Sequence, residues 1–376
     1  YGSYAIAGGK GNFSDGTFSF VGGGYSNKIQ GNGGYSFLGG GSYNSLSGES
    51  SFIGTGKGNV ITTSTLYGSI VSGQLNYVNG RSGFVGNGYR NSSSFFSSVL
   101  NGKQNIASGN YSFIGGGYSN SGTGIQSVVV SGYKNIVSGN YGFIGTGSEN
   151  KITGNYAVIV SGQQNRAYGN RSFIGAGNSN SAATKYSIVV GGSGNLSNGY
   201  YSIIAGGRVN SSLTNYSIIV GGKDNLISGN TASDNTSSSF IGGGKNNIAL
   251  DGYLGTSAVV VGGNNNFAGG SYYTASFVGG GRFNKAFGQY SNVVGGVNNT
   301  ITNTGEYSSV IGGRNNMANA PSTFIGGGTF NSAMTNSSIV VGGISNLVSD
   351  TESFIGGGQS NINYGKRGFI GCGIGN

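Results

Sequence analysis

The sequence predicts an all-β fold: a parallel β-solenoid, or β-roll, of about 24 short rungs of about 15 residues, running as one continuous domain over residues 1–376. Two observations predict it, a repeat that recurs along the whole chain and a composition that joins 81 Gly to 35% hydrophobic residues. So much glycine is typical of a flexible linker, but a linker has no use for so much apolar surface. Collagen is excluded, because Gly does not recur at every third position and the chain has 1 Pro.

The repeat is an eight-residue pattern, FVGGGYSN in residues 20–27, that ends on an asparagine and recurs 24 times, mostly at intervals of 15 residues. The residue three positions before the asparagine is always Gly, as at Gly24 and Gly117. The residue six positions before it is always Ile, Val or Leu, as at Val21 and Ile114. Columns this constant over a fixed period indicate stacked repeats.

A rung of this length suffices for two strands of about five residues and two tight turns. We expect the aliphatic column inside the solenoid and the invariant Gly in a turn with positive φ. The asparagines should stack at one corner, buried, and hydrogen-bond the turn backbone and each other. The residues assigned to this structural Asn ladder are Asn27, Asn59, Asn105, Asn120, Asn135, Asn150, Asn165 and Asn225.

Three consecutive spacings are stretched, which predicts longer inter-rung loops within residues 226–246, 248–265 and 267–283. Solenoids carry functional insertions as loops on a regular scaffold. A ligand site in a loop is therefore expected near residues 228–275.

A second pattern concerns the residue seven positions before the asparagine. Wherever it is Phe, the residue two positions later is Gly, as in Phe113 and Gly115; elsewhere the pair is small or aliphatic, as in Val128 and Val130. Both positions flank the interior residue and point outward. The summed side-chain volume of the two positions is thus conserved between rungs, which indicates a packed face. We expect this face to be buried against copies of the same chain in a homotrimer. The self-assembly face is assigned to Phe20, Phe37, Phe113, Phe143, Phe173, Phe240, Phe324 and Phe354.

Catalysis and cofactor binding are not expected, because the chain has no His and its 9 carboxylates are scattered. Asp350 and Glu352 form one close pair, expected in a solvated turn, and Cys372 is interpreted as a small structural residue. No metal site is predicted. Apolar runs are too short to span a membrane.

Basic residues cluster one or two positions before the asparagine, along one predicted edge. This edge is interpreted either as a binding stripe for acidic glycans, nucleic acid being less favoured, or as a device for solubility. Its residues are Lys10, Lys57, Lys103, Arg208, Lys223, Lys245, Arg282 and Arg314. Glycosylation sequons in the opposite turn are expected to be accessible at Asn110, Asn170, Asn215 and Asn336.

The segment GNYSFIGG, residues 109–116, resembles the head repeats of trimeric autotransporter adhesins, which implies a left-handed β-roll assembled as a homotrimer. The half-rungs Asn-x-aliphatic-x-Gly, such as residues 135–139, resemble the repeats of grass-type ice-binding β-rolls. Ice binding requires a flat exposed row of Thr or similar residues, whereas the most regular outer face here carries Phe and Tyr.

These observations together predict a non-enzymatic fibre segment, a structural shaft and adhesin, located outside the cell, on the cell surface or on a virion surface. Its partners are expected to be copies of itself and cell-surface or acidic glycans. Two alternatives are a subunit of a polymeric extracellular filament and an ice-binding protein.

Overall fold

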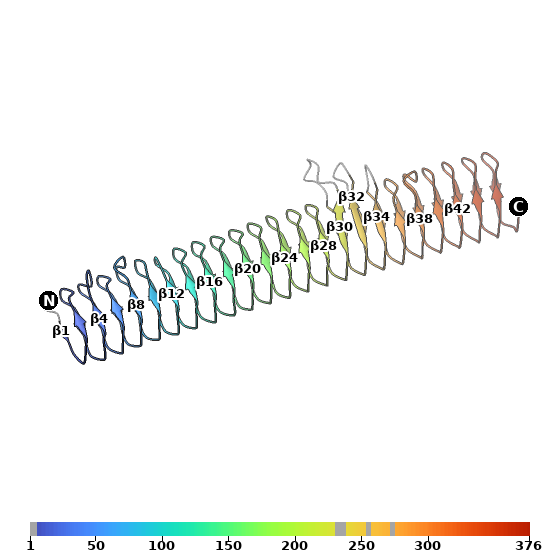
Figure 1. The fold of residues 1–376 in the computed structure, drawn as a ribbon. Coiled ribbons are helices and arrows are strands. Elements are labelled where there is room, and N and C mark those ends of the chain that lie inside the picture. The colour runs from blue at the N-terminus through green and yellow to red at the C-terminus, as the bar shows by residue number, and fades with distance from the viewer. Residues whose placement is uncertain (1–5, 230–237, 253–256, 271–274) are drawn as a thin grey trace. The chain divides into compact units, whose positions relative to one another are not determined.

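The computed structural model describes residues 6–229, 238–252, 257–270 and 275–376. These residues form an all-β parallel β-solenoid with rungs of about 15 residues and contain no helix, which confirms the predicted fold class. The chain divides into two compact units, unit 1 (Tyr1–Ser179) and unit 2 (Asn180–Asn376). Within each unit, successive rungs lie side by side as stacked coils (Figure 1).

Odd-numbered strands form what we call the first wall, and each pairs in parallel with the next odd-numbered strand of its unit, as β15 with β17. In unit 1 they are β1 (Ile6–Ala7), β3 (Phe20–Val21), β5 (Phe37–Leu38), β7 (Phe52–Ile53), β9 (Ser69–Ile70), β11 (Phe84–Val85), β13 (Ser98–Val99), β15 (Phe113–Ile114), β17 (Val128–Val129), β19 (Phe143–Ile144), β21 (Val158–Ile159) and β23 (Phe173–Ile174). In unit 2 they are β25 (Ile188–Val189), β27 (Ile203–Ile204), β29 (Ile218–Ile219), β31 (Phe240–Ile241), β33 (Val259–Val260), β35 (Phe277–Val278), β37 (Asn292–Val293), β39 (Ser309–Val310), β41 (Phe324–Ile325), β43 (Ile339–Val340), β45 (Phe354–Ile355) and β47 (Phe369–Ile370).

Even-numbered strands form the second wall in the same way, as β16 pairs with β18. In unit 1 they are β2 (Phe13–Ser14), β4 (Lys28–Ile29), β6 (Ser45–Leu46), β8 (Val60–Ile61), β10 (Tyr77–Val78), β12 (Ser92–Ser93), β14 (Ile106–Ala107), β16 (Ser121–Gly122), β18 (Ile136–Val137), β20 (Lys151–Ile152) and β22 (Arg166–Ala167). In unit 2 they are β24 (Ser181–Ala182), β26 (Leu196–Ser197), β28 (Ser211–Ser212), β30 (Leu226–Gly229), β32 (Ile248–Asp251), β34 (Phe267–Gly269), β36 (Lys285–Ala286), β38 (Thr300–Ile301), β40 (Met317–Ala318), β42 (Ser332–Ala333), β44 (Leu347–Val348) and β46 (Ile362–Asn363).

Most strands are two residues long, so the predicted length of about five residues was wrong. The cause is the backbone conformation, which turns left-handed in three columns of a typical rung. The invariant Gly has positive φ as predicted (Gly117, 93°), but so do the residue just before the ladder Asn (Ser119, 56°) and a residue of the opposite turn (Gln126, 53°). A third parallel contact, a single bridge such as Tyr118↔Tyr133, lies between the two walls.

The core holds one inward side chain from each wall in a rung, as predicted from the aliphatic columns. Ile144 on the first wall and Ile152 on the second are both fully buried. A column that the repeat analysis passed over adds buried serines at the start of the first wall, such as Ser112 and Ser127.

The first rung departs from the predicted register. Ala7 pairs with Val21, and Ile6 pairs with Phe20, so Ile6 stands in the outer column. The reason is that this rung has two glycines, at residues 8 and 9, where the next has three.

After the first rung, the rungs in the described part of the chain differ in length at the turn that leads from the second wall to the next first-wall strand. Two extra residues between Ile29 and Phe37, for example, leave both strands in register with their neighbours. Spacing from each first-wall strand to its ladder Asn stays constant after the first rung.

Candidate functional surfaces

The ladder asparagines occupy the corner between the two walls, and all eight named ones are buried. The Asn135 backbone N–H donates to Asn120 Oδ1 at 2.9 Å, while its Nδ2 donates to the carbonyls of Ser131 (3.3 Å) and Gly147 (2.9 Å). Its Oδ1 accepts from the Asn150 N–H at 3.1 Å. The side chain thus bonds its own rung and the following rung, while the backbone N–H bonds the side chain of the preceding one, which makes this column a structural element.

Backbone geometry explains why that column needs an amide. Strand N–H groups donate to the following rung, as Ile136 N donates to the Asn150 carbonyl at 2.9 Å. The left-handed residue before each ladder Asn reverses this direction: Lys134 N donates to the Tyr118 carbonyl of the preceding rung at 2.9 Å. The next N–H, that of Asn135, also points backward, and the Asn120 side chain supplies its acceptor.

A second, exposed Asn ladder occupies the opposite turn of unit 1. Ile125 N donates to Asn140 Oδ1 (2.9 Å), Asn140 N to Asn155 Oδ1 (2.9 Å) and Asn155 N to Asn170 Oδ1 (3.0 Å). Sequence reasoning missed this ladder, although the 15-residue spacing of these asparagines was a signal for it.

The predicted glycosylation asparagines lie in that turn. Asn110, Asn170 and Asn336 are exposed, and Asn215 is half-buried. Asn215 Oδ1 accepts from the Tyr200 N–H at 2.8 Å, as Asn170 does from Asn155. Sugar attachment would use the Nδ2 atom, so these oxygen contacts and a glycan are compatible.

The predicted Phe column lies on the outer surface of the first wall. Phe20, Phe37 and Phe143 are exposed, at 39%, 42% and 37%, and the other named members are half-buried. Where Phe rungs are adjacent the rings stack, as Phe20 on Phe37 with centroids 5.4 Å apart.

The pairing of Phe with Gly has a cause within one chain. A Cβ at Gly22 would stand 3.2 Å from Phe20 Cε1 and 2.5 Å from the Gly39 carbonyl oxygen of the next rung, and one at Gly242 would stand 3.3 Å from Phe240 Cε1 and 2.4 Å from the Val261 carbonyl oxygen. A side chain in place of the Gly would therefore meet both the Phe ring and the next rung of the same chain. The pairing does not by itself indicate a partner, as the sequence interpretation supposed.

The apolar strip that these rungs form remains exposed in the single chain. We define the strip as the outer Phe column together with the outer column two residues later. In that second column Val130 is 42% exposed and Val190 is 49% exposed. Across the described residues of both units, neither column contains a charged side chain.

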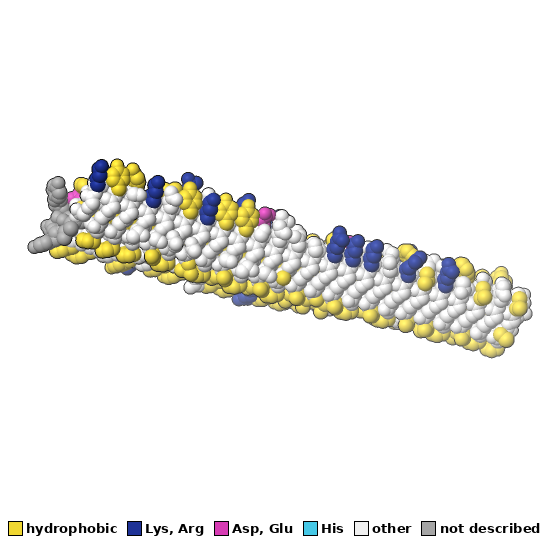
Figure 2. All heavy atoms as spheres, turned by 90° about the horizontal axis from the view of Figure 1, so that it is seen from below, with side chains coloured by type: hydrophobic (Ala, Val, Ile, Leu, Met, Phe, Trp, Pro, Cys, Tyr) yellow, Lys and Arg dark blue, Asp and Glu magenta, His cyan; other side chains and the backbone are white. Residues whose placement is uncertain are grey.

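The eight predicted basic residues are exposed and lie at the bridge between the walls, two residues before the ladder Asn. Figure 2 shows Lys and Arg side chains in a row along one edge within each unit. In unit 2 Arg208 bridges Lys223, and Lys223 bridges Lys245, so three cations occupy three consecutive rungs.

The predicted long loops lie only partly within the structure. Residues 230–237, 253–256 and 271–274 of the expected ligand region 228–275 are outside the described residues. Around them the second wall lengthens, since β30 and β32 pair over four residues from Leu226 to Gly229. Asp251 at the end of β32 is buried and accepts a hydrogen bond from the Ser239 hydroxyl.

The carboxylate pair is engaged in local contacts. Asp350 accepts from the Thr351 N–H at 2.7 Å, and Glu352 accepts from Arg367 Nε at 2.6 Å. The guanidinium of Arg367 lowers the pKa of the Glu352 carboxyl by hydrogen bonding and by its charge. Cys372 is an exposed free thiol. In the portion of the chain with described positions, no group of three or more His, Cys, Asp or Glu could hold a metal ion.

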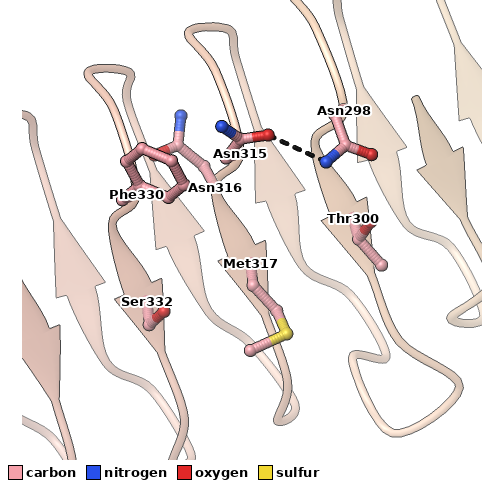
Figure 3. A pocket seen from close by; sticks show the side chains of 7 residues that line it. All are labelled: Asn298, Thr300, Asn315, Asn316, Met317, Phe330 and Ser332. Carbon is pink, nitrogen blue, oxygen red and sulfur yellow. Dashed lines mark hydrogen bonds between the residues drawn. The ribbon is translucent and has the colours of Figure 1, made fainter. Parts of the chain in front are cut away.

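One shallow hollow of about 330 Å³ lies beside the basic row in unit 2, where Phe330, Asn315 and Asn298 line one side and Met317 and Thr300 the other (Figure 3). Asn298 Nδ2 donates to Asn315 Oδ1 at 2.8 Å. This hollow presents amides and one aromatic ring to solvent.

Comparison with protein-family models and with curated protein sequences found no match for this chain. The described residues contain no helix with the length and apolar character needed to cross a membrane.

Proposed function

We propose that the chain is a non-enzymatic fibre segment, a structural shaft and adhesin outside the cell or on a cell or virion surface, which assembles through its apolar strip as a homotrimer. The observation that carries this proposal is the strip itself: exposed Phe and Val side chains in two columns without a charge among the described residues. Large exposed apolar surfaces on soluble chains mark interaction sites.

The area of the strip suits a permanent interface. A half-exposed Phe or Val offers on the order of 70 Å², so the twelve first-wall strands of unit 2 offer on the order of 900 Å². A stable interface buries roughly 800 Å² of each partner. In a homotrimer each copy contacts two others, so the strips of both units are needed, and charges placed in one unit are enough to weaken the assembly.

The partner that best matches the strip is another copy of the chain. When copies are related by rotation about an axis parallel to the stacking direction, each rung of one strip contacts the same rung of the other strips. Val130 would then face Val130 of each other copy, and a Phe rung would face Phe rungs. A different partner would need the same spacing of about 4.8 Å along its own surface.

The test is the mass of the full chain in solution, measured by light scattering or sedimentation. We expect three times the chain mass of 37.8 kDa. Val130→Asp with Val160→Asp places two charges in the strip, where these residues are 42% and 45% exposed, and should give a folded chain of lower mass.

The matched control changes Ile106→Asp and Ile136→Asp, which are 46% and 40% exposed on the outer surface of the second wall. This control should keep the mass of the unchanged chain. A monomeric unchanged chain would overturn the proposal, and continuous fibres in negative-stain images would favour the filament alternative.

A further inference from the structure

Five cations of unit 2 form what we call the ridge: Arg208, Lys223, Lys245, Arg282 and Arg314. Parallel bridges connect their column rung by rung, with Asn264 and Val297 filling the two positions between. At a rung spacing of about 4.8 Å, the six steps from Arg208 to Arg314 span roughly 29 Å. Charges thus recur every 5–10 Å, roughly, along the stacking direction of this unit.

The same column in unit 1 is built differently. Its cations Lys10, Lys57 and Lys103 are separated by Tyr, Ser or Gln in the intervening rungs. Lys103 Nζ lies 5.7 Å and 5.3 Å from the ring centroids of Tyr89 and Tyr118, so neighbouring aromatic faces stabilise its charge. Solubility alone would not require the two units to differ in this way.

The ridge is only slightly neutralised by the protein. Within the described part of unit 2, the ion pair on the ridge joins Lys223 Nζ and Asp224 at 3.6 Å. Arg208 and Lys245 flank this pair one rung away on either side, so three like charges are held together against their mutual repulsion. An anionic chain lying along the column would relieve that repulsion at every rung.

The chemistry beside the ridge favours a glycan over a nucleic acid. Arg208, Lys223 and Lys245 adjoin Val209, Asp224 and Asn246, which provide no aromatic ring for stacking bases. Exposed rings near the other two ridge cations, Phe283 beside Arg282 and Phe330 in the rung after Arg314, are too few to stack a run of successive bases. The hollow at the Arg314 end offers the amides of Asn298 and Asn315, groups suited to sugar hydroxyls (Figure 3).

We infer that the unit-2 ridge is a binding site for an extended anionic polysaccharide, whose sulfate or carboxylate groups lie along the stacking direction opposite Arg208, Lys223, Lys245, Arg282 and Arg314. Binding is driven by release of counterions, so it falls steeply with salt. The hollow contributes contacts to uncharged parts of the sugar.

The test measures binding of a size-fractionated heparin oligosaccharide to the full chain as a function of salt. The triple variant Arg208→Gln, Lys223→Gln, Lys245→Gln should bind about tenfold more weakly or worse, and the slope of log affinity against log salt should fall by about 2. Gln74, Gln163 and Gln359 already occupy this column, so the variant is expected to fold.

The matched control is Lys10→Gln, Lys57→Gln, Lys103→Gln, which removes the same charge from the same column of unit 1. It should change the affinity less than twofold, roughly. Equal weakening by both variants would show that only net charge matters and would overturn the inference, as would tighter binding of single-stranded DNA of matched length than of heparin.

A third variant, Asn298→Ala with Asn315→Ala, should weaken heparin binding without changing the salt slope. If this variant binds heparin as tightly as the unchanged chain, the hollow is excluded from the site. The ridge is tested separately by its own triple variant. The assembly state does not enter this readout, because the ridge and the apolar strip occupy different columns.

Discussion

The ring of Phe113 lies over the backbone of Gly115 in the same rung: a Cβ placed on Gly115 would stand 3.6 Å from Phe113 Cε1 and 2.4 Å from the Val130 carbonyl oxygen. In the next rung the equivalent positions hold Val128 and Val130. Phe with Gly, and Val with Val, are alternative ways to cover the equivalent surface of the first wall in two rungs.

This relationship predicts strong coupling between the two positions. Gly115→Val alone should destabilise the chain by about 2–3 kcal/mol, because the new side chain meets the ring and the next rung. Adding Phe113→Val should recover about 1 kcal/mol or more by recreating an aliphatic pair. Thermal or denaturant unfolding of the two single variants and the double variant measures the coupling. Strict additivity would contradict an intrachain origin for the pairing.

Loss of one ladder asparagine should be costly. Asn135→Leu leaves the buried Asn150 N–H without its acceptor and the Ser131 carbonyl without its donor, and it removes one of the two donors to the Gly147 carbonyl, which we expect to cost about 1–3 kcal/mol. Asn140→Leu provides the comparison, since Asn140 accepts from Ile125 N in an exposed turn where water can replace it. Chemical denaturation should show a clearly larger loss for Asn135; equal losses would argue against burial as the cause.

Two adjacent glycines should respond in opposite ways to the same change. Gly222 has φ of 89°, and a Cβ there would stand 2.1 Å from the Gly244 carbonyl oxygen, whereas one on Gly221 would have nothing within 4 Å. Gly222→Ala should therefore destabilise by about 2 kcal/mol or more. Gly221→Ala should be neutral or stabilise by up to about 1 kcal/mol, because it restricts the unfolded chain. Melting temperatures of the two variants, taken at one protein concentration, decide the matter.

The left-handed residues before the ladder Asn predict a stabilising substitution. Val209 has φ of 56°, a conformation that β-branched residues rarely adopt, while Gly194 holds the equivalent position one rung earlier. Val209→Gly should raise stability by about 0.5–1 kcal/mol, after the greater freedom of Gly in the unfolded chain is counted. Gly194→Val should lower it. An unfolding experiment in which Val209→Gly is the less stable form would show that the valine makes contacts that outweigh its strain.

Stability should depend little on pH between about 5 and 9, because the chain has no His. Glu352 should contribute on the acid side. Arg367 lowers its pKa in the folded state, so this contribution is present above the ordinary pKa of a glutamate and is lost as the pH falls through the lowered value. Melting temperatures from pH 2 to 7 for the unchanged chain and for Glu352→Gln should converge at the acid end and differ above about pH 5. Parallel curves would contradict the ion pair.

Much of the fold could be predicted because residues that stack on one another in a solenoid fall in the same column of the sequence repeat. The constant Gly, exemplified by Gly117, indicated a residue under steric constraint, and the constant aliphatic residue, such as Ile114, indicated the interior. The left-handed columns left no such mark. The column just before the ladder Asn holds Ser119, Lys134 and Glu149, residues with no shared chemistry, because what they share is a reversed N–H direction.

The surfaces were predicted less completely. Listing the cations by their distance from the asparagine placed them on one edge, and the pairing of Arg208, Lys223 and Lys245 across rungs of unequal length shows that they occupy consecutive rungs. The Phe and Gly covariation was interpreted as packing against a partner, which stays a prediction, and the contacts of the Gly position with the Phe ring and the next rung of the same chain were not predicted.

The turn in which the rungs after the first differ in length also makes the chain an acceptor for foreign peptides. Residues 30–35 fit two extra positions there without shifting Phe37 or Ser45 out of register with the rungs beside them. An epitope or a short binding loop grafted into this turn would emerge at the same edge of its unit whichever rung carried it. Grafts in successive rungs would form a row at intervals of about 4.8 Å, a density of display that separate domains joined by linkers do not reach.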